Sequence, residues 1–224
     1  MTIALLITTL NEVTGVKKVV PRIKKEWVDE ILFVDGGSTD GTIEEAEKMG
    51  FKVIIQKQKG LGAAIIEGVN AIKSDNFILF GPDGNDEPEK IPQIIQKFKE
   101  GYDQVAATRF GKGSVNLDAG KIDTFGNKMF AFLVNAFFGG HLTDCLVELR
   151  IMSKKTFQEL NFDEMSLIAI QQMCIRGLKK RQHIYEIIGN EGERMGGIRK
   201  MKPLPVGASL SLEIIKEFIH WKTN

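Results

Sequence analysis

The sequence predicts an α/β fold, in which a mostly parallel β-sheet is flanked by helices within a single domain. Short apolar runs alternate with stretches of helical periodicity over the first hundred residues, which is the rhythm of β-α-β units. The apolar runs are nearly continuous, as expected of strands that are buried on both faces. The chain has 224 residues, of which 43% are hydrophobic, and this is enough to bury one full core.

The first half shows the clearest alternation. The expected strands are residues 3–9, 30–35, 52–56 and 77–80, and the expected helices are residues 13–25, 42–49, 61–72 and 87–100. Residues 39–42 supply capping side chains before the acidic Glu44 and Glu45, and Gly50 supplies a stop signal. Pro88 suits the first turn of the fourth helix.

The pattern is looser after a strand-like run at residues 105–108. There we expect a Gly- and Lys-rich loop at 111–120, a Phe-rich helix at 124–138, a strand at 148–153, a helix at 164–176, a strand at 183–188 and a final helix at 209–221. The sequence contains no repeat, low-complexity tract or linker. We therefore expect the two halves, 1–110 and 111–224, to share one core.

Composition narrows the class of protein. A net charge of +1 gives no field for non-specific nucleic-acid binding. Cys145 and Cys174 are the only cysteines, which suits a reducing compartment better than a disulfide framework. The first residues lack the basic region of a signal peptide, and no apolar run approaches the roughly 20 residues of a spanning helix. These features favour a cytoplasmic enzyme.

The most informative segment is ILFVDGGSTDGT at residues 31–42. Its apolar run ends abruptly at Asp35, which is followed by Gly36 and Gly37. In open α/β sheets, ligands bind beyond the carboxyl ends of the strands, and glycines let the backbone approach a ligand closely. Asp35 is therefore expected to meet a ligand.

Five segments together resemble family 2 glycosyltransferases with the GT-A fold. VDGGSTDGT at residues 34–42 is similar to the family signature VDDGSTDGT. TTLNE at 8–12, KGLGAA at 59–64 and GPDGN at 81–85 resemble the family's PTYNE segment, KGLGAA turn and DxD motif, in the family's order. RMGGIRK at 194–200 resembles the RxxGxSK segment of dolichyl-phosphate mannosyltransferase-like members. The resemblance implies a GT-A-like (Rossmann-like) sheet and a hexosyltransferase that uses a nucleoside diphosphate sugar.

The resemblance also implies where that donor binds. Residues 1–110 would form the nucleotide-sugar half and residues 111–224 the acceptor half. Asp35 would bind the nucleobase, with Asn11 and Glu12 in the same pocket. The full set of expected nucleotide-sugar contacts is Thr8, Leu10, Asn11, Glu12, Asp35, Gly36, Lys59, Gly60, Gly62, Pro82 and Asp83.

A divalent metal is expected at the DxD-like segment. Asp83 matches the second aspartate of the motif and is a candidate catalytic residue, because a carboxylate at a strand end can hold Mg²⁺ or Mn²⁺ against a leaving diphosphate. Asn85 offers a further oxygen ligand. Gly81 replaces the first aspartate of the motif, which weakens the expected metal site. Alternatively, Pro-Asp-Gly-Asn is only a β-turn.

Basic residues are expected to bind phosphate groups. The resemblance points to Arg109, Lys121, Arg194 and Lys200, with the last two on a Gly-containing loop that could close over the substrate. For each of them a solvated surface side chain is the alternative.

The expected acceptor is a polyprenyl or dolichyl phosphate, which is already ionised and needs no general base. A hydroxyl acceptor is the alternative, and Asp144 or Glu148 would then be the base. Asp144 could instead be a cap or a salt-bridge partner. A lipid acceptor implies peripheral contact with a membrane, for which the amphipathic final helix is a candidate, although packing on the sheet is its other use. Because Gly81 replaces an expected metal ligand, a sugar-nucleotide sensor without catalytic activity is a further alternative.

Overall fold

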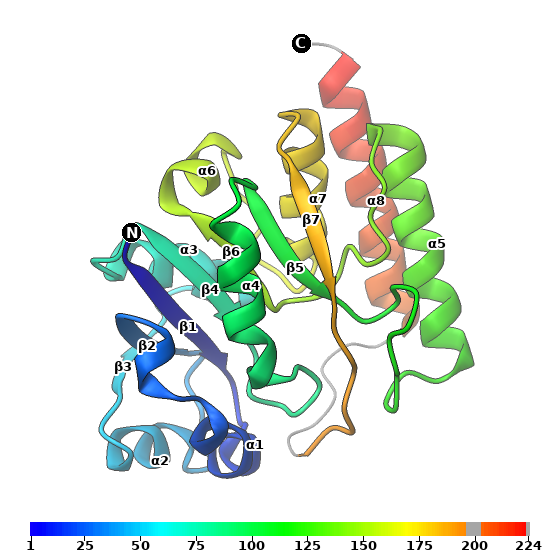
Figure 1. Ribbon diagram of the computed structural model, residues 1–224. Helices are drawn as coiled ribbons and strands as arrows, with labels where there is room; N and C mark the ends of the chain where they lie inside the picture. The colour runs from blue at the N-terminus through cyan, green and yellow to red at the C-terminus, as the bar shows by residue number, and fades with distance from the viewer. Residues whose placement is uncertain (196–202, 223–224) are drawn as a thin grey trace.

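The computed structural model describes residues 1–195 and 203–222 and contains one seven-stranded sheet between layers of helices (Figure 1). The strand order is β3-β2-β1-β4-β6-β5-β7. The strands are β1 (Ile3–Thr9), β2 (Glu30–Asp35), β3 (Lys52–Ile55), β4 (Asn76–Phe80), β5 (Gln104–Thr108), β6 (Arg150–Ser153) and β7 (Ile184–Ile188). This is the expected α/β fold with a mostly parallel sheet.

The direction of the strands determines where a ligand can bind. β1, β2, β3 and β4 run parallel, and β6 is antiparallel to both of its neighbours, β4 and β5. The chain moves outward from β1 to β2 and β3, and then returns to form β4 on the other side of β1. β1 and β4 therefore flank the topological switch point, where open α/β sheets bind ligands at the carboxyl ends of the strands.

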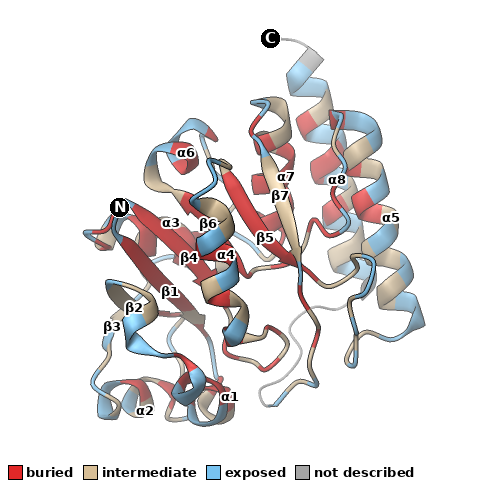
Figure 2. Cartoon of the chain, in the orientation of Figure 1, coloured by how far each residue is buried: buried red, intermediate tan, exposed pale blue. Residues whose placement is uncertain are grey.

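Both faces of the sheet are covered, and alternate residues of each strand contribute to different cores. Leu5 of β1 packs in a cluster with Val16 and with Ile91, on the face that carries α1 and α4. Leu6 packs in a second cluster with Ile65 and Met173, on the face that carries α3, α6 and α7. Figure 2 shows the buried central strands between helices whose outer surfaces are exposed. Burial on both faces accounts for the continuous apolar runs in the sequence.

The helices lie between and beside the strands. They are α1 (Val13–Val19), α2 (Thr42–Lys48), α3 (Leu61–Ala71), α4 (Ile91–Phe98), α5 (Lys121–Phe138), α6 (Lys154–Glu159), α7 (Ala169–Lys179) and α8 (Pro203–Lys222), with 3₁₀ turns at Val20–Arg22, Lys25–Trp27 and Pro88–Lys90. The long helices α5 and α8 lie side by side at one end of the molecule (Figure 1) and share a third apolar cluster with α7. Among the residues that the structure describes, no helix combines the length and apolar character of a membrane span.

Most expected elements are present, with shifted boundaries. The first helix ends at Val19 instead of residue 25, because Pro21 lacks the N–H that an α-helix needs and starts a 3₁₀ turn. α5 begins at Lys121, three residues earlier than expected. α7 begins at Ala169, five residues later. α8 begins at Pro203, six residues earlier. The short helix α6 was not expected; Ser153 caps it by accepting a hydrogen bond from the Thr156 backbone N–H at 2.9 Å.

Candidate active site

The loops after β1, β2 and β4 meet at the carboxyl edge of the sheet, together with the segment that enters β6. This follows from the parallel register of β1, β2 and β4 and the antiparallel register of β6. Asp35 ends β2, Gly81 and Asp83 follow β4, and Glu148 precedes β6. Most of the predicted site residues therefore lie at one edge.

The loop after β2 is shaped by the Asp35 carboxylate. Asp35 is fully buried and accepts hydrogen bonds from the Thr9 hydroxyl at 2.7 Å, from the Gly37 and Ser38 amides at 2.8 and 2.6 Å, and from the Ser38 hydroxyl at 2.7 Å. A carboxylate has about four lone-pair sites, so these donors account for its capacity. This arrangement differs from the expected direct contact with a nucleobase: Asp35 holds the loop that would carry such a contact.

Leu10, Asn11 and Gly36 form the surface above Asp35. Asn11 has a positive φ of 54° and bridges the two loops, because its Oδ1 accepts from the Thr39 amide at 2.8 Å. Leu10 is 38% exposed. A Cβ on Gly36 would lie 3.2 Å from the Leu10 side chain, so Gly36 keeps the approach beside Leu10 open. A flat ligand could pack against this surface.

The loop after β4 is held on both sides. Its Pro82 carbonyl rests on Gly15 of α1, where a Cβ would come within 2.0 Å of that oxygen. On the other side, the Met195 amide donates to the Asp83 carbonyl at 2.8 Å, and the Gly192 amide donates to the Asn85 carbonyl at 2.9 Å. These contacts fix the backbone of Asp83 against α1 and against the segment that follows β7.

Asp83 and Arg194 form an ion pair at the switch point. Arg194 Nη1 lies 2.8 Å from Asp83 Oδ2, and Arg194 Nη2 lies 3.9 Å from Glu12 Oε1. The side chains of Asp83 and Arg194 are 24% and 19% exposed. Within the described part of the chain, the buried Arg194 Nε and Asn85 Oδ1 atoms have no hydrogen-bond partner. We call Arg194, Asp83 and Glu12 the Arg194 cluster.

A second ion cluster consists of Arg109, Asp144 and Glu191, here called the Arg109 cluster. Arg109 donates to both oxygens of Asp144, at 2.7 Å from Nε and 3.1 Å from Nη2, and to Glu191 Oε1 at 3.0 Å. The Asp144 side chain is 0% exposed. The expected roles of Arg109 as a phosphate ligand and Asp144 as a base facing the acceptor do not fit this geometry, because each is taken up by the other. Asp144 forms a salt bridge with Arg109, which was one of the alternatives to its role as a base.

The pKa values of two buried carboxyl groups, Asp144 and Asp86, are shifted in opposite directions. Burial would raise the pKa of Asp144, but the charge and hydrogen bonds of Arg109 outweigh burial and lower it below its ordinary value. A carboxylate with a lowered pKa is a poor general base. Asp86 behaves in the opposite way: burial raises its pKa well above the ordinary value, and the nearby Asp83 carboxylate adds to the shift. Asp86 therefore resists ionisation beside the Arg194 cluster.

The remaining predicted residues fall into three groups. Gly60 and Gly62 pack against another loop, since a Cβ at either would come within 2.0 Å of the Met165 or Glu164 carbonyl, and the Gly62 amide donates to Met165 at 3.0 Å. This close packing alone requires glycine at both positions, whether or not a nucleotide binds there. Lys59 and Lys121 are exposed, at the start of α3 and α5. Lys200 lies outside the described residues.

Sequence reasoning missed Asp86 and Glu191. Asp86 lies three residues beyond Asp83, so its position near the strand end was visible, but its burial was not. Glu191 gave no local signal, because it meets Arg109 across 82 positions of the chain. Glu148 was considered only as a base, whereas it accepts a hydrogen bond from the Thr8 hydroxyl at the end of β1.

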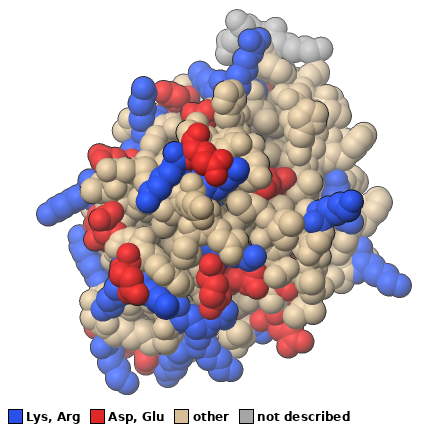
Figure 3. Space-filling view, in the orientation of Figure 1, with Lys and Arg blue, Asp and Glu red and all other residues tan. Residues whose placement is uncertain are grey.

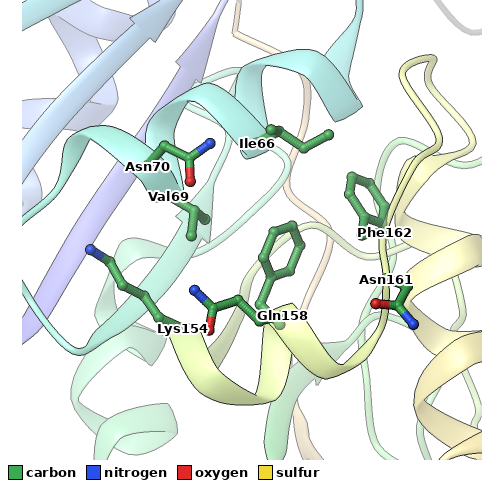
Figure 4. Close-up of a pocket in the computed structure, with 8 residues that line it drawn as sticks. Ile66, Val69, Asn70, Lys154, Gln158, Asn161 and Phe162 are labelled. Atoms are coloured by element: carbon green, nitrogen blue, oxygen red, sulfur yellow. The ribbon is translucent and has the colours of Figure 1, made fainter.

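A separate cavity lies away from this edge, between α3 and α6 (Figure 4). Its volume is about 290 Å³, and Lys154 and Gln158 of α6 face Val69 and Asn70 of α3 across it. α6 follows the carboxyl end of the antiparallel β6, which places the cavity toward the opposite edge of the sheet. On the face shown in Figure 3, acidic and basic side chains are intermixed, in keeping with the net charge of +1.

The chain has a GT-A-like α/β fold, and a carboxylate and an arginine meet at its switch point. Residues 4–160, more than half of the chain, match the model of the family described as Glycosyl transferase family 2. The chain belongs to this family and is a glycosyltransferase.

Curated relatives include a dolichyl-phosphate hexose transferase and a dolichol-phosphate mannosyltransferase. The chain is 27% identical over 216 residues to a dolichyl-phosphate hexose transferase of Haloferax volcanii, and the match covers 96% of this chain and 92% of that protein. It is 31% identical over 121 residues to the dolichol-phosphate mannosyltransferase of Pyrococcus furiosus, covering 50% and 34%. It is 29% identical over 166 residues to the glycosyltransferase AglJ of H. volcanii, covering 70% of this chain but only 52% of that protein.

Solved structures show the same fold. Glucosyl-3-phosphoglycerate synthase from Mycobacterium tuberculosis, in a complex with Mn²⁺ and UDP-glucose, superposes with a TM-score of 0.72 over 98% of this chain and 78% of the other, at 19% identity. Its complex with phosphoglyceric acid gives the same TM-score at 20% identity over 98% and 79%. At these identities the likeness concerns the fold.

Proposed function

We propose that this glycosyltransferase moves a sugar from a nucleoside diphosphate sugar to a polyprenyl phosphate. The observation that carries the proposal is the Asp83–Arg194 pair at the β1–β4 switch point, where one carboxylate and one guanidinium meet and both are partly exposed. A guanidinium binds phosphate oxygens through two parallel hydrogen bonds, and a carboxylate can hold a cation against them. The dolichyl-phosphate hexose transferase that matches 96% of the chain supports the choice of acceptor.

The donor is assigned to the half formed by residues 1–110. The nucleoside would lie on Leu10 and Gly36, above the Asp35-supported loop, and its diphosphate would extend toward Asp83. Thr8 near the end of β1, and Asn11 and Glu12 in the loop that follows it, would line the same site. Lys121 and Lys200 remain proposed phosphate ligands on the acceptor side, in residues 111–224.

The residues at the switch point suit Mg²⁺ or Mn²⁺. Asp83 and the Asn85 side-chain oxygen would hold the ion, and the buried Asn85 Oδ1 has no partner among the residues described. No three acidic, His or Cys side chains converge into a complete metal centre in residues 1–195 and 203–222. Phosphate oxygens of the donor would complete the coordination, as is usual for these ions, and the bound ion would neutralise the leaving diphosphate. Mn²⁺ accompanies UDP-glucose in the M. tuberculosis structure.

The Arg109 cluster engages Asp144, one of the two candidate bases for a hydroxyl acceptor, and this supports a phosphate acceptor. A hydroxyl must lose a proton to a base during transfer, and Arg109 keeps Asp144 paired and its pKa low. A phosphate acceptor is ionised already. Arg194, which contacts Asp83 at 2.8 Å, would bind such a phosphate.

Contact with a membrane surface is part of the proposal, because a polyprenyl chain is embedded in lipid. α5 exposes Ile122, Phe125 and Phe132, which are 78%, 70% and 68% accessible. α8 exposes Leu212, Ile215 and Ile219 at helical spacing. Amphipathic helices with exposed apolar side chains bind the interfacial region of a bilayer.

Transfer assays test the proposal directly. Purified protein is incubated with radiolabelled UDP- and GDP-hexoses, Mn²⁺ and either a short polyprenyl phosphate or the corresponding free alcohol. The proposal expects label in the lipid phosphate product and none in the alcohol product. Transfer to the alcohol alone would favour a hydroxyl acceptor. Donor binding without any transfer or hydrolysis would favour a sugar-nucleotide sensor.

A further inference from the structure

Gly81 leaves a space at the end of β4 that another residue fills. A Cβ built on Gly81 would lie 3.3 Å from Glu148 Oε2 and 3.7 Å from Glu148 Cδ. The carboxylate of Glu148 therefore occupies the region into which a longer side chain at position 81 would project. Gly81 is also the position at which the family resemblance calls for the first aspartate of the DxD motif.

The sheet register brings the two positions together. β4 and β6 pair antiparallel with Leu79 opposite Arg150, and continuing this register by two residues places Gly81 opposite Glu148. Side chains directly opposite each other on antiparallel strands are close neighbours. The residue before β6 also keeps its place in the sheet, because the Ala107 amide of β5 donates a hydrogen bond to the Leu149 carbonyl at 3.0 Å.

Glu148 is held toward the switch point and not toward the outside of the sheet. Its Oε1 accepts a hydrogen bond from the hydroxyl of Thr8, on the strand β1 that neighbours β4.

We propose that Glu148 supplies the metal-binding carboxylate that Gly81 lacks, so that the second acidic ligand of the metal comes from the segment before β6. Mg²⁺ and Mn²⁺ bind oxygen ligands according to the charge and position of those ligands, so the carboxylate can come from either strand. A glutamate opposite Gly81 can reach the site across the strand pair, and Thr8 orients it as an outer-sphere partner orients a ligand. The inference rests on the proposed function, because it assumes that a metal–diphosphate complex binds at Asp83.

The test measures Mn²⁺ binding, not turnover. The dissociation constant for Mn²⁺ is measured from the electron paramagnetic resonance signal of the unbound ion, in the presence of UDP and then GDP. Glu148→Gln keeps the size of the side chain and its acceptor for Thr8 but removes the charge. Glu148→Ala removes both, and the double variant Gly81→Asp with Glu148→Ala returns the carboxylate to position 81.

We expect Glu148→Gln and Glu148→Ala to weaken Mn²⁺ binding by at least about tenfold, and the double variant to recover most of the loss. Glu159→Gln, an exposed residue at the end of α6, is the control for the same change of charge and should bind as wild type. Melting curves without metal identify any variant that fails to fold.

The outcomes separate this inference from the proposed function. Wild-type affinity in Glu148→Gln, or a double variant no better than Glu148→Ala, would overturn the role of Glu148 and leave the transferase proposal standing. A wild-type protein that binds neither nucleotide with Mn²⁺, and that transfers no sugar, would overturn the proposed function itself.

Discussion

The two arginine clusters at the carboxyl edge of the sheet differ in how completely their charges are paired. Arg109 makes short hydrogen bonds to both oxygens of Asp144 and to Glu191, and the acidic partners are 0% and 5% exposed. Among the residues that the structure describes, Arg194 makes one short contact, to Asp83, and a longer one of 3.9 Å to Glu12. Asp83 is also 24% exposed.

The difference indicates what each cluster does. Deeply buried ion pairs hold loops together, and removing one partner leaves an uncompensated charge in the interior. The Asp83–Arg194 pair is partly exposed, and within residues 1–195 and 203–222 the Arg194 Nε atom has no partner, so this pair can accept a ligand charge without breaking a buried network. We therefore propose that the Arg109 cluster stabilises the fold and that the Arg194 cluster binds the substrate.

The largest expected effect is the loss of transfer in Asp83→Asn. A metal ion that neutralises a leaving diphosphate contributes several kcal/mol, so removing its carboxylate should lower kcat/KM by about a thousandfold. The unfolding temperature should stay within about 4 °C of wild type, because a partly exposed ion pair is worth at most about 1 kcal/mol. Steady-state kinetics and calorimetry measure the two effects. Undiminished transfer would remove Asp83 from the site.

Asp144→Asn should show the opposite pattern. Leaving Arg109 without its main partner should cost about 3 to 5 kcal/mol of unfolding free energy, measured by urea denaturation. The triple variant Asp144→Asn, Arg109→Met and Glu191→Gln should regain part of that loss, because it removes all three charges of the cluster. Transfer by the folded fraction should persist. A stable Asp144→Asn protein that transfers no sugar would instead make Asp144 the catalytic base.

The variant Arg194→Ala tests whether the arginine of the Arg194 cluster binds a phosphate group of the substrate. Charge-assisted hydrogen bonds to phosphate contribute roughly 1.5 to 3 kcal/mol, so kcat/KM should fall about ten- to a hundredfold with little change in stability. Arg22→Ala is the matched control, because Arg22 also pairs with a carboxylate at 2.7 Å but lies on the 3₁₀ turn after α1. Equal losses in both variants would indicate a general effect of surface charge.

The smallest effect concerns pH. Burial raises the pKa of Asp86 in the folded protein, so the stability that Asp86 contributes is present below its unfolded pKa of about 3.9 and is lost as pH rises toward the folded value. Asp86→Asn removes this dependence. The difference in unfolding temperature, variant minus wild type, should therefore be more positive at pH 7 than at pH 4. A difference that is the same at both pH values would contradict the shift.

The sequence was sufficient for the parts of the fold that local pattern determines. Apolar runs located the strands, and Asp35 and Asp83 were correctly placed at strand ends because a polar residue after such a run marks the carboxyl edge. The end of α1 was missed, although Pro21 carried the signal, and α6 is too short for a periodic pattern to reveal.

The pairing of side chains could not be predicted, because it depends on contacts distant in the chain. Asp144 meets Arg109 only because β6 enters between β4 and β5, and no periodicity encodes that order. Gly60 and Gly62 look like a ligand-binding turn in sequence, whereas their close partner is the loop at Met165, about a hundred positions away. The same strand insertion brings Glu148 across from Gly81.

The most direct test compares Asp83→Asn and Asp144→Asn in one thermal-shift experiment, with and without Mn²⁺ and a nucleoside diphosphate at about 100 times the wild-type dissociation constant. Ligand at that level should stabilise wild type by about 2.7 kcal/mol, or about 5 to 10 °C. We predict that Asp83→Asn melts as wild type without ligand and loses the shift, while Asp144→Asn melts lower and keeps it. A normal shift in Asp83→Asn together with a lost shift in Asp144→Asn would contradict the assignment of the two clusters.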